Sequence, residues 1–473
     1  MFVLGFAASS FAIHAEIPAE TQAVVSTGGT QITIGGDIRF RGLWQENTQD
    51  FDNKVVSSTN TGDQQKYDQR VRLQVEAKVT PNTTGLIQLE AGNDTGFSQD
   101  TTNWGSESSG ASGSLGFANG KMSSMKILQA WILHQGSGLL SVPALVKVGH
   151  MPIQIGPNGL FYEHTKFGDD AILLGVDPIK GMHLILGTVK MFEGQTGLND
   201  DVDAYTFIGS YEINKDTVVG LDVTYANGQN LGHGTNFGFV SPTDLDLHLW
   251  NFGANGKTRI AGLGIAFDVA GQLVKDTDLA STNHGDNSYK TWAGKFDLDY
   301  KINPVTLLFR AAYGSGNNNM SGLLRKDFVT SQSFIQHDTF VYEYLTPNAA
   351  GNSYGGGLQN TWFLKAGVSA DIVKSLTGSL SVYYLRSVID PLKESGAPGQ
   401  ATDPSGIGRS KSIGTEIDGI VTYQIDKNLK YYVEGGYLFA GNFMKVFTPL
   451  NATGVHNSPD DAWAVRHGIQ LSF

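Results

Sequence analysis

The sequence predicts an all-β chain that forms a single antiparallel barrel of about 18 strands, with 16 strands as the alternative. Three observations predict it. Apolar and polar residues alternate along many short segments, short and long connections alternate between these segments, and the last segment runs to the final residue. Composition agrees, because glycine is 59 of 473 residues, above the usual share of about 7%.

Composition also excludes several classes of protein. The mean hydropathy is −0.16, and no run of 18 apolar residues occurs, so a helical membrane protein is not expected. The net charge of −12 disfavours nucleic acid as a partner. With no cysteine, thiolate metal sites, disulfides and covalent haem attachment are ruled out.

The chemistry-bearing residues form no recognisable catalytic or metal motif. No G-x-S-x-G segment occurs, and the histidines lack a paired i,i+4 spacing. Asn199 to Asp203 could hold Ca²⁺ through its oxygens, but the glycine and terminal glutamate of a calcium loop are missing. We therefore expect no enzyme, no cofactor and no metal, and an acidic loop tip at 199–203.

The first 15 residues, MFVLGFAASSFAIHA, are apolar and rich in small residues, which is typical of a secretory signal peptide. Its usual basic start is absent, which leaves open a natural start upstream of Met1. A buried first strand is the alternative. Residues 16–30 are expected to be an unstructured periplasmic lead-in, and residues 31–473 the barrel.

The first strand, 31–45, sets the pattern that the others repeat. Ile34, Ile38 and Phe40 share one face, while Asp37, Arg39 and Arg41 share the other. The same alternation marks further segments: 67–80, 292–302, 305–313, 362–372, 417–425 and 429–439. So many ionisable groups on one face need water, which a lumen supplies. Residues 126–134 and 182–192 alternate poorly, so their facing is left open.

Connections supply the second signal. Short turns are expected at 80–83, 136–143, 177–180, 214–215, 254–257, 303–304, 373–375 and 426–428. Long polar connections are expected near 46–66, 94–125, 154–168, 194–201, 228–243, 275–288, 315–359, 388–411 and 441–461. Bacterial transmembrane barrels alternate short periplasmic turns with long extracellular loops, so both termini are expected to be periplasmic.

Aromatic residues near strand ends are typical of the girdles at a membrane interface. They are Trp44, Tyr67, Tyr205, Tyr211, Tyr225, Trp292, Tyr300, Tyr313, Trp362, Tyr423, Tyr437 and Trp463.

The last strand alternates to the end of the chain, with Val465, His467, Ile469, Leu471 and Phe473 on one face. This ending resembles that of Gram-negative outer-membrane porins, whose final strand closes on a C-terminal Phe. In that family the barrel-assembly machinery recognises this ending as its signal. Residues 413–440, with Gln129-Ala130-Trp131 and Val146 to Gly149, further resemble 18-stranded channels akin to the alginate-export barrel, in architecture and not in substrate.

The resemblance implies an integral outer-membrane porin that gives small hydrophilic solutes and ions passive diffusion through a water-filled lumen. The alternatives are a substrate-specific channel or exporter, and a barrel scaffold or adhesin that uses residues 315–359. The implied partners are outer-membrane lipid, lipopolysaccharide, the barrel-assembly machinery and the solutes. A homotrimer and a monomer both remain open.

Five inward arginines lie where the barrel would close: Arg39, Arg41, Arg70, Arg72 and Arg466. With Asp37 and Arg310 they are the expected pore-lining residues. Such a wall resembles the arginine ladder of porins, which selects solutes by charge. In the alternative interpretation each arginine simply pairs with Asp37, Asp68 or Glu76.

The third long connection, 154–170, is short for an extracellular loop, and it is aromatic and acidic. In many porins the third loop folds into the lumen and narrows it. The candidate constriction residues of 154–170 are Phe161, Tyr162, Glu163, Asp169 and Asp170. An ordinary surface loop is the alternative, and the connection 315–359 is the other place for a constriction.

Overall fold

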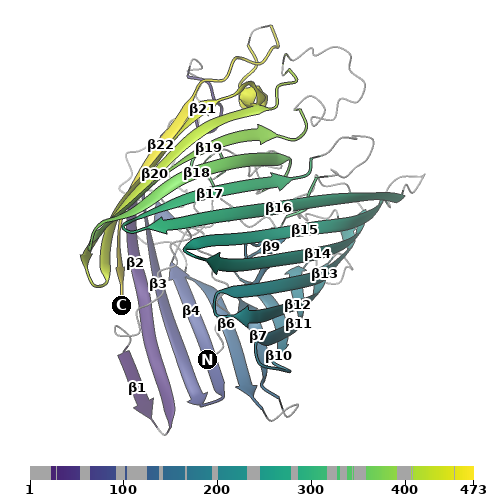
Figure 1. Ribbon diagram of the computed structural model, residues 1–473, viewed down its shortest axis with the longest axis vertical. Coiled ribbons are helices and arrows are strands. Elements are labelled where there is room, and N and C mark those ends of the chain that lie inside the picture. The colour runs from purple at the N-terminus through teal and green to yellow at the C-terminus, as the bar shows by residue number, and fades with distance from the viewer. Residues whose placement is uncertain are drawn as a thin grey trace, which may run out of the picture.

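The alternating segments form strands that close into one ring, as the computed structural model shows (Figure 1). The structure describes residues 23–27, 29–53, 64–91, 102–103, 125–137, 142–165, 168–193, 201–231, 245–278, 286–316, 327–330, 338–343, 345, 358–390, 406, 408–451 and 453–473. The signal-peptide prediction for residues 1–15 lies outside these ranges.

Twenty strands share one sheet, and 18 of them make the ring, because β1 and β5 each pair on one side only. The ring strands are β2 (Thr30–Glu46), β3 (Gln64–Thr80), β4 (Thr83–Ala91), β6 (Met125–Gly136), β7 (Ala144–Met151), β10 (Asp169–Val176), β11 (Met182–Phe192), β12 (Val202–Asn214), β13 (Thr217–Leu231), β14 (Leu245–Ile260), β15 (Leu263–Asp278), β16 (Asp286–Ile302), β17 (Val305–Gly314), β18 (Thr361–Val373), β19 (Leu376–Ser387), β20 (Ser412–Asp426), β21 (Leu429–Ala440) and β22 (Ala462–Ser472). The predicted count of 18 antiparallel strands is confirmed.

The remaining elements are short. They are β1 (Ala23–Thr27), β5 (Thr102–Asn103), β8 (Gln154–Ile155), β9 (Tyr162–Glu163) and the 3₁₀ helix η2 (Asn442–Phe447). In the described part of the chain, no helix is long and apolar enough to cross a membrane.

Closure occurs between the first and last ring strands. β22 pairs antiparallel with β2, so that Leu471 lies opposite Ile38. Beyond the strand end, the N–H of Phe473 donates to the carbonyl of Gly36 at 3.0 Å, and the N–H of Gly36 donates back at 2.8 Å. A closed ring leaves no strand edge with unpaired backbone groups.

The N-terminal part of β2 extends past the end of β22, and β1 covers it. Ala23 pairs with Ile34, and Thr27 with Thr30, in an antiparallel hairpin. The expectation of an unstructured lead-in is therefore wrong for residues 23–27. The physical reason is that β22 ends opposite Gly36, so the first residues of β2 would otherwise present an open edge.

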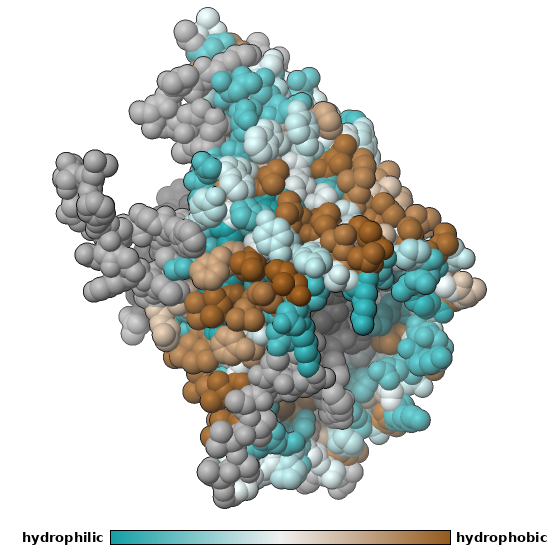
Figure 2. Space-filling model, turned by 90° about the vertical axis from the view of Figure 1, so that its left-hand side faces the viewer, coloured by the Kyte–Doolittle hydropathy of each residue, from teal (hydrophilic) through white to brown (hydrophobic). Residues whose placement is uncertain are grey.

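The two faces of the ring differ as the alternation predicts. On β2, Phe40 is 39% exposed on the outer face, whereas Arg39 and Arg41 on the inner face are each 7% exposed. Figure 2 shows hydrophobic side chains gathered over a broad part of one outer face. The apolar groups thus lie outside and most charged groups lie inside, the reverse of a soluble protein.

Outward aromatic residues form two belts. Near the long connections the exposed residues are Tyr67, Tyr205, Trp250, Trp292, Tyr384 and Tyr437, and near the short turns they are Tyr211, Tyr300, Tyr423 and Tyr431. Trp292 and Tyr300 are eight residues apart on β16, roughly 27 Å along the strand. With a tilt of about 40°, the belts are separated by roughly 20 Å, close to the height of the apolar band of outer-membrane barrels.

Short turns and long connections alternate around the ring as predicted, with one displaced turn. The turn expected at Ala254 to Lys257 is wrong, because β14 continues to Ile260 and turns at Ala261 and Gly262. Both turn residues have positive φ, 49° and 86°, as a two-residue hairpin turn requires. The Asn255-Gly256 pair stays in the strand, where the Phe267 ring lies over Gly256.

The two strands with poor alternation each contain a bulge. In β6 the register shifts between Gln88 and Leu89 of β4, so that Leu128 is an extra residue. Ile127 and Ile132, five positions apart, consequently both face outward, at 62% and 63% exposure. β11 has a similar shift between Lys190 and Phe192. A bulge reverses the parity of a strand, which explains the broken pattern of β6, whereas the shift in β11 affects only its last residues.

Candidate functional site in the lumen of the barrel

The inner wall where the ring closes carries the five predicted arginines, called the arginine wall below. They come from three adjacent strands: Arg39 and Arg41 from β2, Arg70 and Arg72 from β3, and Arg466 from β22. The strand register places Arg39 directly opposite Arg70. A further cation joins this row, because Arg39 lies opposite Gln470, which lies opposite Lys430 of β21.

Carboxylates balance most of the arginine wall. Arg41 donates to both oxygens of Asp68 at 2.8 Å, and Arg70 donates to Asp37 at 2.7 Å. Arg72 donates to Glu90 at 2.5 Å, and Arg466 donates to Glu434.

The sequence analysis gave Asp37, Asp68 and Glu76 as alternative partners of the arginines. Asp37 and Asp68 do bind arginines, but Glu76 does not take the expected place. Glu90 takes the place expected for Glu76, since Glu90 lies opposite Arg72, while Glu76 lies opposite Thr33 nearer the short turns. Most arginines of the wall are therefore paired with a carboxylate. The wall presents a row of ion pairs and not a surface of uncompensated positive charge.

Gln470 is a buried polar residue of this wall. Its side chain is 1% exposed, and neither its amide nitrogen nor its carbonyl oxygen has a hydrogen-bond partner among the described residues. It lies between Lys430 and Arg39 in the register.

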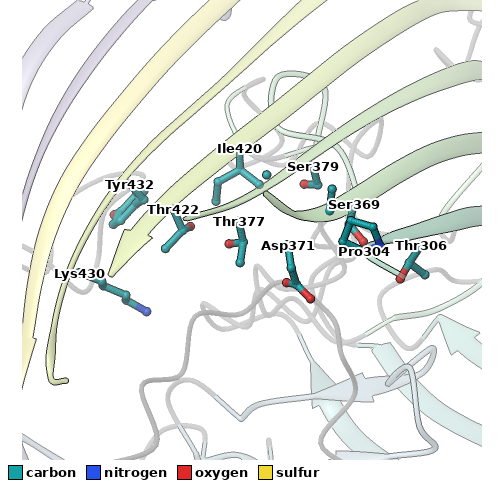
Figure 3. Close-up of a pocket in the computed structure, with 12 residues that line it drawn as sticks. Pro304, Thr306, Ser369, Asp371, Thr377, Ser379, Ile420, Thr422, Lys430 and Tyr432 are labelled. Carbon is teal, nitrogen blue, oxygen red and sulfur yellow. The ribbon is translucent and has the colours of Figure 1, made fainter. Parts of the chain in front are cut away.

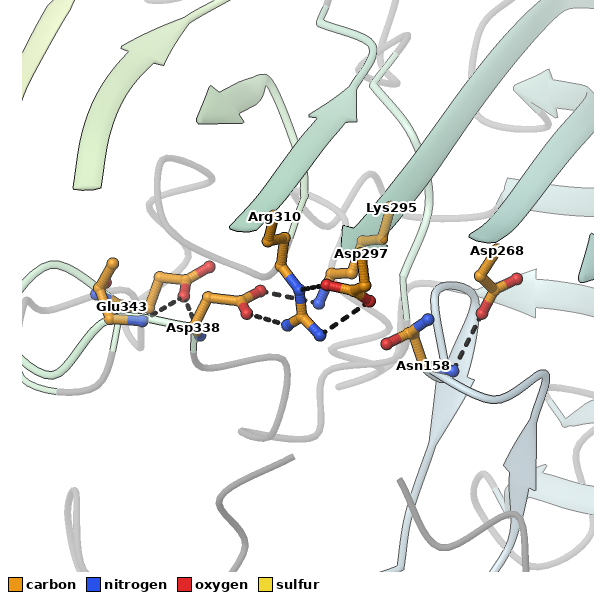
Figure 4. Close-up of polar contacts among 8 residues, drawn as sticks. Asn158, Asp268, Lys295, Asp297, Arg310, Asp338 and Glu343 are labelled. Carbon is orange, nitrogen blue, oxygen red and sulfur yellow. Dashed lines mark hydrogen bonds and ion pairs between the residues drawn. The ribbon is translucent and has the colours of Figure 1, made fainter. Parts of the chain in front are cut away.

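The third long connection folds inward as a small hairpin of β8 and β9. At its tip, the N–H of Asn158 donates to Asp268 of β15 at 2.9 Å, and a Cβ on Gly156 would lie 3.3 Å from the same carboxylate (Figure 4). Gly156 adopts a φ of +76°, which favours glycine. β15 is five places round the ring from β10, so the hairpin crosses part of the lumen.

Phe161 and Tyr162 of this hairpin are each 1% exposed, packed in the apolar cluster inside the barrel. The Tyr162 hydroxyl donates to Asp169 at 2.5 Å. Burial, and then the Asp169 carboxylate, raise the pKa of Tyr162 well above its ordinary value.

The acidic residues of the connection do not face the arginine wall as a group. Asp169 is held by Tyr162 and by His164, whose Nδ1 lies 2.6 Å away, and Glu163 accepts the N–H of Thr165. Asp170 corrects the sequence expectation, because its side chain is 74% exposed and contacts His150. It follows the inward Asp169 on β10, so it lies on the outer face.

The seventh long connection also enters the lumen, and its segment 338–343 is the most strongly held. Lys295 of β16 lies 2.8 Å from Asp338, and Arg310 of β17 donates to both Asp338 and Asp297 (Figure 4). Glu343 accepts the N–H of Thr339 at 3.0 Å, which closes the segment into a turn.

Two carboxylates of β20 bind the backbone of the same segment. Glu416 accepts the N–H groups of Val341 at 2.5 Å and Tyr342 at 3.0 Å, and Asp418 accepts that of Phe340 at 3.0 Å. The guanidinium of Arg466 lies 5.0 Å from the centre of the Phe340 ring. Three consecutive backbone donors on carboxylates fix the segment against the wall.

An earlier part of the seventh connection, at Val329, is hydrogen-bonded to β15. Gln272 of β15 donates to the carbonyl of Val329 at 2.7 Å and accepts its N–H at 2.8 Å. The seventh connection therefore contacts strands from β15 to β22 and narrows the lumen together with the third. The apolar run Phe340-Val341-Tyr342 inside a polar connection was the available sequence signal for this.

The charges around segment 338–343 shift two pKa values in opposite directions. Burial would raise the pKa of Asp338, but Arg310 and Lys295 outweigh it and hold that pKa below its ordinary value. Burial, and then the neighbouring Asp338, raise the pKa of Glu343 to about 8. One oxygen of Glu343 is buried without a hydrogen-bond partner in the described part of the chain.

Metal-binding geometry is not found among the described residues, where no three His, Asp or Glu side chains converge. At the described end of the acidic stretch 199–203, Asp201 and Asp203 instead lie 2.7 and 3.3 Å from the Lys190 ammonium.

The residues of the C-terminal pattern lie on the outer face. Val465, Ile469, Leu471 and Phe473 are each 36–42% exposed there. The Phe473 ring lies over Gly36, where a Cβ would be 2.9 Å from it.

No protein-family model matches this chain, and no curated protein matches it in sequence. Several solved structures resemble it. The outer membrane protein OprD of Pseudomonas aeruginosa aligns with a TM-score of 0.49 and 11% identity, covering 93% of this chain and 94% of that one. OccK5 (OpdH) of the same organism gives 0.48 and 11%, covering 93% and 98%. OpdK, crystallised with vanillate, gives 0.47 and 13%, covering 93% and 99%.

Proposed function

We propose that this chain is an outer-membrane porin that gives small hydrophilic solutes and ions passive diffusion through its lumen. One observation carries the proposal: a closed ring of 18 strands is apolar on its outer face and charged on its inner face. In hydrocarbon every backbone polar group must be paired within the protein, which a closed barrel achieves. A barrel of this size encloses water in addition to its inward side chains.

The proposed orientation follows from the connections. The short turns and the Phe473 end lie at one end of the ring, and the long connections lie at the other. Bacterial barrels place short turns in the periplasm, so both ends of the barrel domain are assigned to that side. The expected signal peptide at 1–15 agrees with export from the cytoplasm.

The inserted connections favour a selective channel over a wide diffusion pore. Segment 338–343 is held by two carboxylates and two cations, and the tip of the third connection is held by Asp268. Segment 338–343 also contacts Arg466 of the arginine wall, so the inserted connection and the wall lie together in the lumen. Fixed charges of both signs at a constriction orient polar solutes and hinder apolar ones. Diffusion needs no catalytic step and no cofactor.

Single-channel recording tests the proposal. Purified protein in planar bilayers should give discrete current steps that grow with KCl concentration, and the same preparation after boiling should give none. Folded protein should migrate faster on gels than boiled protein, because a closed sheet has no edge from which to unfold. Heat-modifiable protein that passes no current at any salt concentration would contradict a porin and favour the scaffold alternative.

A further inference from the structure

The inner wall has a hollow beside the short turns of β17 to β21 (Figure 3). It is an open depression of about 240 Å³, smaller than the pockets that bury drug-sized ligands, so it would contact only part of a solute. Six hydroxyl-bearing side chains line it: Thr306, Ser369, Thr377, Ser379, Thr422 and Tyr432.

Strand register explains why these hydroxyl groups gather. Thr306, Ser369 and Ser379 lie opposite one another on β17, β18 and β19. In the next inward row Thr377 lies opposite Thr422, which lies opposite Tyr432. Neighbouring strands lie about 4.8 Å apart, so the two rows form a regular array of hydroxyl groups.

The serine and threonine side chains of the array are partly or fully exposed, whereas Tyr432 is 2% exposed and lies against Gly468. Within the described residues, none of the six hydroxyl groups forms a side-chain hydrogen bond. Elsewhere in the lumen, buried threonines are paired: Thr206 lies 2.9 Å from Thr224, and Thr291 donates to Gln272 at 3.1 Å. Each hydroxyl both donates and accepts, which matches the hydroxyl groups of a polyol.

The charges at the hollow decide the class of solute. It has one carboxylate, Asp371 on β18, and one ammonium, Lys430 on β21, with Thr377 and Thr422 between them (Figure 3). Three strand spacings separate them, roughly 14 Å between backbones. The opposite signs of these two side chains favour a solute without net charge.

We propose that this hollow is a weak subsite for neutral polyhydroxylated solutes, such as mono- and disaccharides. The inference deepens the proposed porin function and rests on it, by naming a class of solute that passes through the lumen. Binding must be weak, because a channel site has to release its solute for conduction to continue.

Maltose titrated into single-channel recordings tests the subsite, with a polyethylene glycol of matched hydrodynamic radius as the reference solute. The expected result is a saturable fall in ion current with maltose and a linear fall with the glycol. The double variant Thr377→Val and Thr422→Val keeps side-chain volume and removes two hydroxyl groups. It should raise the half-saturating maltose concentration about tenfold or more.

Thr84→Val is the matched control, since Thr84 shares the inward parity of Glu90 on β4 and does not line the hollow. Heat-modifiable migration shows that each variant is folded. Equal, linear effects of maltose and glycol on wild type would overturn the subsite while leaving the porin function intact, as would loss of saturation in Thr84→Val.

A folded chain that passes no current would instead overturn the porin function. Calorimetric titration of maltose onto the detergent-solubilised barrel then decides the subsite separately. Saturable heat that the double variant loses supports it, and no saturable heat overturns it.

Discussion

Raising the pH from about 6 to about 8 is expected to loosen segment 338–343 from the barrel wall and to increase the ion current. Glu343 is buried beside Asp338, and its pKa is raised to about 8 from an ordinary 4.5. A released segment would return Glu343 to water and to its ordinary pKa. The docked state therefore holds a proton that the released state gives up between these two pH values.

The sign and size of the effect follow from this linkage. A group whose pKa is raised in the docked state stabilises docking fully below about pH 4.5, and that contribution is lost as the pH rises through about 8. A fully bound proton is worth about 1.4 kcal/mol per pH unit, and Glu343 is half deprotonated at about pH 8, so the docking free energy changes by about 2.3 kcal/mol between pH 6 and pH 8. This corresponds to roughly a fiftyfold change in the docking equilibrium.

Other charges near the segment act in different pH ranges. Asp338 has a lowered pKa, so its contribution to docking is present above its ordinary range and is lost only in acid. The charged groups around the two carboxylates are Lys295 on β16, Arg310 on β17, Lys365 on β18, and Glu416 and Asp418 on β20. Docking is thus expected to be strongest in mildly acidic solution.

Single-channel recording in KCl at the two pH values is the assay. Wild type should show a larger mean current or more frequent opening at the higher pH. Glu343→Gln, which imitates the protonated acid, should stay at the low-current level at both. Asp170→Asn is the control, because that carboxylate lies on the outer face. Equal currents for wild type at both pH values, or an unchanged pH response in Glu343→Gln, would refute the reasoning.

Three further predictions follow. Glu416→Gln weakens two hydrogen bonds that hold the backbone of segment 338–343, each worth about 1.5–3 kcal/mol. The segment should then leave the wall more often, and the mean current at fixed pH should rise. An unchanged current would contradict this. Deleting Phe473 should lower the folded amount in the outer membrane, measured by surface labelling, without altering single-channel conductance; normal surface levels would count against its role in assembly. Converting Arg39, Arg41 and Arg72 to Gln should shift reversal potentials towards cation selectivity, because the carboxylates of Asp68 and Glu90 lose their partners. The shift should be larger at 0.01 M salt, where the Debye length is about 30 Å. Matching reversal potentials at low salt would show that these arginines do not set selectivity.

The residue pattern within a connection was not enough to locate the segment that is held most extensively inside the barrel. Aromatic and acidic residues in 154–170 pointed to the third connection, and its tip does contact Asp268 across the lumen. Yet the most strongly held segment, 338–343, belongs to the seventh connection. Its position depends on Glu416, Asp418, Lys295 and Arg310, which come from three strands spread over more than a hundred residues. No spacing within the connection itself encodes those partners.

One wrong turn prediction, at 254–257, and one strand whose facing was left open, 126–134, each have an identifiable cause. Asn255-Gly256 is a strong turn dipeptide, but the Phe267 ring on the neighbouring strand covers Gly256 and supplies the apolar surface that glycine lacks. The strand 126–134 alternates poorly because an extra residue at Leu128 reverses its parity. Both features are decided by a cross-strand neighbour, which a single strand cannot reveal.

The sequence by itself determined the barrel, favoured 18 strands and, outside 126–134 and 182–192, indicated which strand side chains face inward, because the side-chain period of a strand is two and depends only on neighbours along the chain. Tertiary structure alone decided which charges meet. Arg72 pairs with Glu90 and not with Glu76 because the register of β3 against β4 places them opposite each other. The inserted segments are likewise placed by the closed ring, since only closure brings β15, β20 and β22 around one lumen.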